Sequence, residues 1–248
     1  MIRRRAVLAG FAPGLGLAGP PLLGEPRELL AYAHQLAPLS YGEGKQLHGL
    51  FVELLQDVCN LLELPLRLEL QPLSRALKTR GHGFIVFPLD RQSEREGGYR
   101  WIGPVLPRRV LIYRLSQRQD LDFQGLALLG NRKIGVNRGT GTHKKLLDSG
   151  LHPMAQLEVA NSYASALKML LAGRTDYLAM NELAASWNLR QLGLPPETLS
   201  SVAVLDATGF YWYGVSPQDD VLAARLQHAL EQLQSLGRVE ALKRHYGL

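Results

Sequence analysis

Residues 133–150 read KIGVNRGTGTHKKLLDSG, and this stretch decides the fold class. It predicts a strand, a glycine-rich turn and a helix, in that order. The alternation continues with a strand in LEVAN (157–161), a helix in SYASALKMLLAGR (162–174), a strand in TDYLAM (175–180) and a helix in ELAASWNLRQLG (182–193). Strands that alternate with helices in this way predict an α/β architecture with mostly parallel sheets.

The rest of the chain shows the same two periodicities. LFVELLQDVCNLLELP (50–65) carries an apolar stripe at helical spacing that ends at Pro65, and residues 66–70 alternate as a half-buried strand does. Further strands are predicted in LLAYA (29–33), FIVF (84–87), VLIYRL (110–115), SVAVL (201–205) and FYWYGVS (210–216), and further helices in 73–81, 219–237 and 238–247. HQLAPLSY (34–41) is expected to be a loop. The 248 residues suffice for one large domain or for two lobes of about 100 residues each.

The first 24 residues have the pattern of an export signal. Three arginines precede an apolar stretch with small residues near Ala18 and Gly24. Prolines interrupt this stretch, so it does not predict a membrane-spanning helix. A secretory and a twin-arginine signal both fit. Because no cysteine precedes Cys59, we expect no lipid anchor and a soluble periplasmic protein after cleavage of residues 1–24.

Composition excludes several classes of function. Arg3, Arg4 and Arg5 supply half of the net charge of +6, and no basic run is interleaved with aromatics, so we expect no nucleic-acid partner. The seven histidines show no metal-ligand spacing, and no GxSxG motif is present, so neither a metal, a cofactor nor a hydrolase nucleophile is predicted. Cys59, the single cysteine, stands in the apolar helical stripe and is expected to be buried and unreactive.

Two short motifs could contact an anion. GTGT (139–142) lies between a strand and a helix, where backbone N–H groups can receive one, although it lacks both the P-loop Gly-Lys-Ser/Thr and the third glycine of a dinucleotide fingerprint. Taken alone, the motif favours a tight turn over a ligand contact. Arg95 follows the buried strand 84–87 and so lies at a strand end, where α/β sheets bind ligands. Its other interpretation is a surface arginine paired with Glu94 or Glu96.

Several segments, taken in order, resemble the extracellular solute-binding proteins of family 3, the periplasmic amino-acid receptors. They are HGLFVELLQDVC (48–59), RALKTRG (75–81), FPLDRQSERE (87–96) with YRWIGPV (99–105), KIGVNRGTG (133–141), YASALKMLLAGRTDYLAMNE (163–182) and the closing residues 214–247. The resemblance implies two α/β lobes joined by two crossing segments, with the ligand between them and closure by hinge bending. It places the first lobe at residues 25–109 plus 206–248 and the second at 110–205.

The resemblance also implies a ligand site. Arg95, in the Glu-Arg pair, matches the arginine that binds the ligand's carboxylate, which its guanidinium can grip with two parallel hydrogen bonds. Gly139 and Thr140 match the turn that donates backbone N–H groups to the same carboxylate. Asn181 stands where the receptors have an acid for the ligand's ammonium, and Ala33 or a neighbour stands in place of a second acid. Asp90 could partly restore an acid.

These departures make an ordinary α-amino acid a poor fit, because a buried ammonium without a carboxylate partner is costly. We therefore expect a monomeric protein that binds a small anionic or zwitterionic solute for a membrane ABC permease or a sensor kinase. Arg95, Gly139 and Thr140 would hold its carboxylate. The rest of the solute would contact Asn181, Asp90, Tyr32 and Tyr41.

Two other readings stay open. The first is an enzyme on the same scaffold, such as a lyase resembling cyclohexadienyl dehydratase, in which Asp90, Glu182 or His34 would be the acid or base. The spacing of these residues singles out none of them, and no catalytic residue is assigned. The second is a sensory or interaction module with a degenerate cleft, which the missing acids suggest.

Overall fold

The computed structural model describes residues 28–152 and 155–248. The predicted export signal, residues 1–24, lies outside the described residues. Within them, eight strands form one sheet in the order β4-β1-β5-β10-β6-β9-β7-β8. The strands are β1 (Leu29–Ala33), β4 (Leu66–Leu70), β5 (Phe84–Asp90), β6 (Arg100–Leu115), β7 (Ile134–Asn137), β8 (Leu157–Ala160), β9 (Tyr177–Asn181) and β10 (Leu199–Val215).

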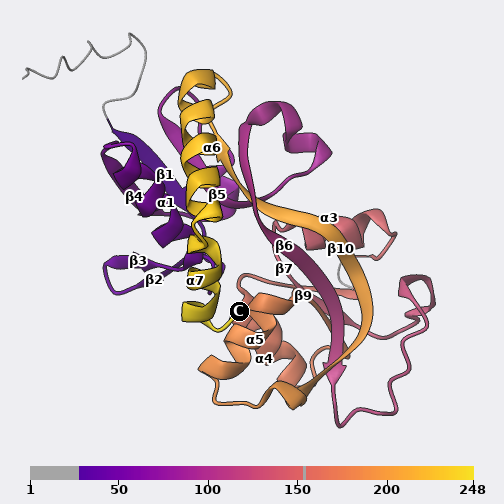
Figure 1. Ribbon diagram of the computed structural model, residues 1–248. Coiled ribbons are helices and arrows are strands. Elements are labelled where there is room, and N and C mark those ends of the chain that lie inside the picture. The colour runs from indigo at the N-terminus through magenta and orange to yellow at the C-terminus, as the bar shows by residue number, and fades with distance from the viewer. Residues whose placement is uncertain (1–27, 153–154) are drawn as a thin grey trace, which may run out of the picture.

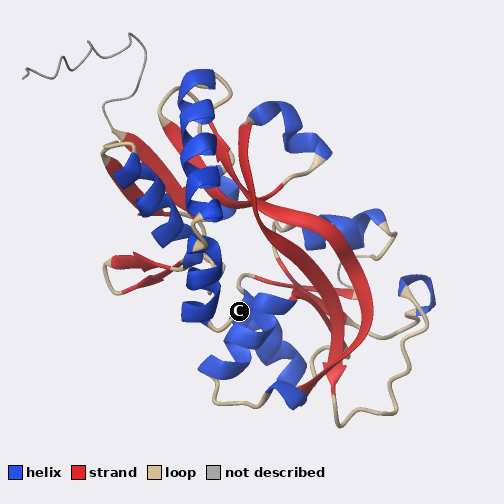
Figure 2. Ribbon diagram, viewed as in Figure 1, coloured by secondary structure: helices blue, strands red, loops and turns tan. Residues whose placement is uncertain are grey.

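Helices cover this sheet in two groups (Figures 1 and 2). They are α1 (Leu50–Leu61), α2 (Leu73–Ala76), α3 (Gly141–Asp148), α4 (Tyr163–Leu171), α5 (Glu182–Gln191), α6 (Asp220–Ser235) and α7 (Arg238–Tyr246), with the 3₁₀ turns η1 (Ser93–Gly98), η2 (Leu126–Leu128) and η3 (Pro196–Thr198). Helix α1 packs against α6 and α7, so that early and late parts of the chain lie side by side. None of the helices in the described ranges is both long and apolar enough to span a membrane.

The sheet has a parallel group of strands at each end and two antiparallel strands between them. At one end β1 pairs in parallel with β4 and β5, and at the other β7 pairs in parallel with β8 and β9. Strands β6 and β10 pair with each other along their length, β10 with β5 and β6 with β9. The long pair therefore links the two α/β units, as Figure 2 shows. The predicted α/β class with mostly parallel sheets is confirmed.

The continuity of β6 and β10 was not predicted. The sequence indicated separate strands at 110–115, 201–205 and 210–216, whereas the structure has two strands of 16 and 17 residues. Their register shifts between Asp206 and Gly209 and again between Tyr211 and Tyr213. Pro104, which has no N–H for the ladder, falls opposite the second shift, and such irregularities accommodate proline within a strand. Both predicted lobe boundaries, 109/110 and 205/206, fall inside these strands.

The core matches the predicted apolar patterns. In α1 the residues Leu50, Leu54, Leu55 and Val58 are buried, and the thiol of Cys59 is buried with them. Burial raises the pKa of the Cys59 thiol to about 12, which keeps it protonated and inert near neutral pH.

Two local predictions were wrong. Helix α2 spans only four residues of the longer helix expected at 73–81. The loop expected after β1 is present up to Ser40, but the hairpin that follows it, of β2 (Tyr41–Glu43) and β3 (Gln46–His48), was not predicted. A three-residue strand is too short to show the period-two pattern that identifies strands in a sequence.

Candidate ligand-binding cleft

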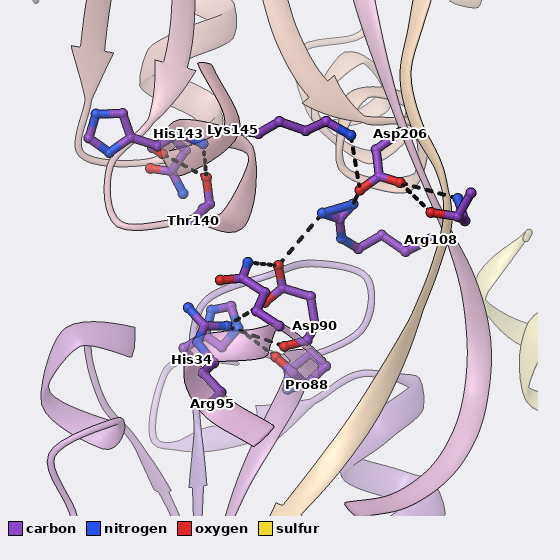
Figure 3. A network of polar contacts seen from close by, with 12 residues as sticks. His34, Pro88, Asp90, Arg95, Arg108, Thr140, His143, Lys145 and Asp206 are labelled. Atoms are coloured by element: carbon purple, nitrogen blue, oxygen red, sulfur yellow. Dashed lines mark hydrogen bonds and ion pairs between the residues drawn. The ribbon is translucent and has the colours of Figure 1, made fainter. Parts of the chain in front are cut away.

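The cleft lies where the ends of strands from the two α/β units face each other. Asp90 is the last residue of β5, His34 follows β1, Gly139 follows β7, and Asn181 is the last residue of β9. Parallel strands present their carboxyl ends at one edge of a sheet, so each unit contributes its loops to this region. Figure 3 shows the polar network that results.

Arg95 binds a carboxylate of its own chain. Its Nη1 donates to Oδ1 of Asp90 at 2.5 Å and approaches the Asp90 carbonyl oxygen at 3.4 Å. The Arg95 and Asp90 side chains are only 14% and 15% exposed. Gln92 Nε2 donates to the other carboxylate oxygen, Asp90 Oδ2, at 2.6 Å. The predicted pairing of Arg95 with Glu94 or Glu96 is thus replaced by an ion pair with Asp90.

The first turn of α3 closes on the same carboxylate from the opposite side. A Cβ atom added to Gly141 would lie 2.1 Å from Asp90 Oδ2 and 2.0 Å from Gln92 Nε2. Only glycine permits this approach. The Asp90 carboxylate therefore lies between the Arg95 guanidinium and the N-terminal end of α3, whose dipole favours a negative charge.

Thr140 and Gly139 form the turn before α3. The Thr140 hydroxyl accepts from the backbone N–H of His143 at 3.2 Å and caps the helix, while it donates to the Asn137 carbonyl at 2.9 Å. Gly139 has a φ of 71° and its N–H donates to His143 Nδ1 at 3.2 Å. The GTGT motif is thus both a tight turn and one wall of the cleft.

A second arginine connects Asp90 to the long strands. Arg108 lies on β6, and its side chain is 8% exposed. Its Nη1 donates to Oδ2 of Asp206 on β10 at 3.0 Å, and its Nη2 lies 3.6 Å from Asp90 Oδ2. Lys145 Nζ is 4.0 Å from the same Asp206 oxygen. Figure 3 shows this chain of charges running from β5 to both linking strands and to α3.

His34 is buried beside this network. Its Nε2 lies 2.8 Å from the carbonyl oxygen of Pro88. Burial lowers the pKa of His34 below its ordinary value of 6.5. The Pro88 carbonyl and Asp90 act in the opposite direction, and Arg95 adds to the lowering. His34 is therefore neutral near pH 7, and a neutral ring next to Arg95 adds no repulsion.

Asn181 caps α5 from the floor of the cleft. Its Oδ1 accepts from the backbone N–H of Ala184 at 2.8 Å, and the residue is 4% exposed. Burial raises the pKa of the neighbouring Tyr163 to about 12, and Asp90 adds to the rise, while the amides of Asn137 and Asn181 oppose it. This end of the cleft thus presents neutral hydroxyl and amide groups.

Three neighbouring spaces share residues of this network. The central one, of about 30 Å³, is lined by Asp90, Arg108, Gly141 and Asn181 among others, and has room for one or two water molecules. A cavity of about 460 Å³ adjoins it through His34 and Thr140, and one of about 380 Å³ through Asp90, Arg108 and Gly141. The Asp90 side chain thus fills the centre of the cleft, with open space on either side.

Four of the seven predicted binding residues line these spaces: Asp90, Thr140 and Asn181 line the central one, and Gly139 lines its larger neighbour. Arg95 reaches the site through its ion pair with Asp90 and itself lines a separate pocket beside Tyr99. The two tyrosines lie elsewhere, outside the sets of described residues that line the three spaces. Tyr32 packs with Leu73, Leu77 and Trp101 against a small core cluster, because strand alternation turns it away from its neighbour Ala33. Tyr41 packs against His48 and Trp187, with ring centroids 5.8 and 5.1 Å apart.

The sequence did not single out Arg108, Asp206 or Gly141. Arg108 occurs in PRRV, where nothing in the pattern distinguishes it from Arg109. Gly141 belongs to the GTGT motif and is the first residue of α3. This position at the start of the helix is the one sequence signal that could have identified it. Within residues 28–152 and 155–248, no group of three or more His, Cys, Asp and Glu side chains is placed to hold a metal ion.

Comparison with known proteins finds similarity in structure only. No family model matches the sequence, and no curated protein matches it. The structure is similar to a histidine kinase sensor domain described as similar to periplasmic binding proteins, with a TM-score of 0.77, 21% identity, and 89% of this chain and 96% of that chain covered.

Amino-acid-binding proteins are similar as well. An ancestral arginine-binding protein bound to glutamine has a TM-score of 0.74 at 15% identity, covering 89% of this chain and 98% of that one. The arginine-, lysine-, histidine-binding protein ArtJ from Geobacillus stearothermophilus has a TM-score of 0.72 at 17% identity, covering 88% and 94%. At such identities the likeness concerns the fold alone, and the chain has the two-lobed α/β fold of the periplasmic binding proteins.

Proposed function

We propose that this protein binds a small carboxylate-bearing solute between its two lobes. One observation carries the proposal: Arg95 and the first turn of α3 already converge on a carboxylate, that of Asp90. A cation on one side and a helix N-terminus on the other form an environment that favours a negative charge. The solute's carboxylate would take this position and the rest of the solute would extend into the adjoining cavity of about 460 Å³.

The lining of that cavity narrows the class of solute. The described residues that line it include Arg138 and the side-chain amides of Gln35, Gln71, Asn137 and Asn161, and no carboxylate. An ammonium group would lose its hydration there without gaining an ionic partner. We therefore propose an organic acid, or an amino-acid-like solute whose polar end is neutral, in preference to an ordinary α-amino acid.

Closure would come from movement of the two α/β units about the strands that link them. We propose lobes at residues 25–109 plus 206–248 and 110–205, which rotate about the register shifts of β10 near Asp206. Lys144 on α3 and Glu94 on η1 form an ion pair of 3.0 Å between the proposed lobes. A monomer exported to the periplasm would present this closed form to an ABC permease or a sensor kinase.

The alternative of an enzyme gains no specific support from the site. Asp90 is held by Arg95, and Glu182 accepts a hydrogen bond from Arg109 at 2.9 Å. His34 is buried against the Pro88 carbonyl. Each candidate acid or base is thus engaged in a structural contact, whereas general acid–base catalysis needs a group within reach of the substrate's proton.

Thermal unfolding with a panel of mono- and dicarboxylic acids and amino acids tests the proposal. We expect at least one carboxylate to raise the melting temperature in proportion to the logarithm of its concentration above Kd, and Arg95→Ala to abolish the rise. Arg95→Lys should weaken it, since lysine lacks the planar fork. Arg100→Ala, which removes an arginine paired with Asp220 on the surface, is the matched control. A shift that survives Arg95→Ala would contradict the proposed site, and a panel without any shift would favour a degenerate sensory module.

A further inference from the structure

We propose that Asp90 is an internal occupant of the carboxylate position, which an incoming solute displaces by exchange. The inference rests on the proposed function and adds the residue that sets affinity and selectivity. Asp90 holds the place between Arg95 and Gly141, and with it in place the central space is about 30 Å³. That space is too small for a carboxylic acid of the proposed class, so binding requires the Asp90 side chain to move.

A second cation is already positioned to receive the displaced charge. Arg108 Nη2 lies 3.6 Å from Asp90 Oδ2, beyond hydrogen-bond distance but within reach of a side-chain rotation. Gln92, which donates to Asp90 Oδ2 at 2.6 Å, belongs to the same segment as Asp90. When a solute carboxylate takes Arg95, Asp90 can therefore turn to Arg108 without leaving a buried carboxylate unpaired.

The exchange would reach the linking strands. Arg108 on β6 is bound to Asp206 on β10, next to the register shifts of that strand. A second carboxylate at Arg108 competes with Asp206 for its donors. A solute bound at Arg95 thereby alters the Arg108–Asp206 ion pair that joins the two strands. The solute's charge is in this way coupled to the region of β10 about which we propose that the lobes rotate.

Exchange also accounts for selection of solutes. A solute with no carboxylate cannot replace the ion pair that Asp90 already forms with Arg95. Such a solute does not displace Asp90 and is rejected. A solute that carries a carboxylate binds more weakly than it would to an empty position. Only the molecules in which Asp90 has moved away can bind it, and the smaller their fraction, the lower the apparent affinity. Removal of the Asp90 carboxylate should therefore strengthen carboxylate binding.

Rescue by acetate tests the exchange without knowledge of the natural solute. In Asp90→Ala the acetate ion can occupy the space of the missing side chain. We expect acetate to raise the melting temperature of Asp90→Ala in proportion to the logarithm of its concentration above Kd, and more than that of the wild type, at constant ionic strength set with sodium chloride. The double variant Asp90→Ala/Arg95→Ala should not respond. Asp120→Ala, which removes an exposed carboxylate paired with Arg118, is the matched control and should behave as the wild type does.

Asp90→Asn keeps the test decisive if the alanine variant does not fold. Its amide is isosteric and does not compete as an anion, so we expect the melting temperature to begin to rise at an acetate concentration on the order of tenfold lower than in the wild type. Equal acetate responses of wild type, Asp90→Asn and Asp120→Ala would overturn the exchange.

If a panel solute binds in an Arg95-dependent manner and Asp90→Asn leaves its affinity unchanged, the exchange is wrong while the proposed function stands. If acetate rescues Asp90→Ala but no panel solute acts on the wild type, the carboxylate position stands and the solute class is wrong.

Discussion

Asp90 and Arg95 lie five residues apart in sequence and bind each other at 2.5 Å, and Asp90 lines the central space of the cleft. Both are well shielded from water, and α3 of the other α/β unit contacts Asp90 through Gly141. The ion pair is thus both a local contact that orders η1 and part of the surface between the two units.

Gly141 should tolerate no side chain. The added methyl group of Gly141→Ala would lie about 2 Å from the Asp90 and Gln92 side-chain ends, and Asp90 cannot yield without leaving Arg95. We expect the free energy of unfolding to fall by about 1–3 kcal/mol, as for other overpacked sites, measured by urea denaturation. Gly97→Ala, at a glycine with no atom within 4 Å of the added Cβ and ordinary φ, is the control. Equal stability of both variants would show that α3 does not close on Asp90.

Arg108 and Asp206 should be strongly coupled. Arg108→Met leaves Asp206 without its arginine, and breaking a buried pair in this way costs about 3–5 kcal/mol. Asp206→Asn should cost less, since Arg108 keeps Asp90 within 3.6 Å. In a double-mutant cycle by urea denaturation, the double variant should therefore be more stable than the sum of the single changes implies. Additive effects would exclude the coupling; the exposed pair Arg118–Asp120 supplies the comparison.

His34 should make stability fall in mild acid. Because burial lowers its pKa in the folded protein, the unfolded chain takes up a proton near pH 6.5 that the folded protein does not. Its contribution is complete above pH 6.5 and is lost as the pH falls below that value. We expect His34→Asn to reduce the loss of stability between pH 7.5 and about pH 5.5, followed by urea midpoints.

The exposed His228 gives the control for that measurement. His228→Asn makes the same substitution at an exposed position on α6. If His34→Asn loses as much stability as the wild type over the same range, another group causes the acid sensitivity.

Asn181 should decide whether an ammonium is accepted. Asp at this position can still cap α5, because its carboxylate can accept from the Ala184 N–H as the amide does. The added carboxylate would line the small central space, where the ammonium of a ligand could pair with it. We expect glutamine or arginine to raise the melting temperature of Asn181→Asp more than that of the wild type. Asn161→Asp, in the same cleft beside Arg138, should gain no such response; an equal gain would mean that added negative charge alone suffices.

Local patterns of the sequence determined the elements and the fold class. The stripe in residues 50–62 and the alternation of strands and helices from 133 to 193 need only neighbouring residues to be recognised, because side-chain period follows backbone geometry. The resemblance of ordered segments then placed Arg95, Gly139 and Thr140 near one anion. The same reasoning could not join 201–205 to 210–216 in one strand, since pairing with β6 overrides local irregularity in β10.

Only the tertiary structure decided what occupies the cleft. The sequence shows Asp90 five residues before Arg95 but not that its carboxylate lies between Arg95 and Gly141, because that depends on α3 arriving from the other α/β unit with a glycine at its first residue. It likewise gives no sign that Arg108 and Asp206, 98 residues apart, form one ion pair. Periodicity records which side chains face the core, whereas the meeting of charges across a cleft depends on how whole units pack, and that packing is fixed by contacts distant in sequence.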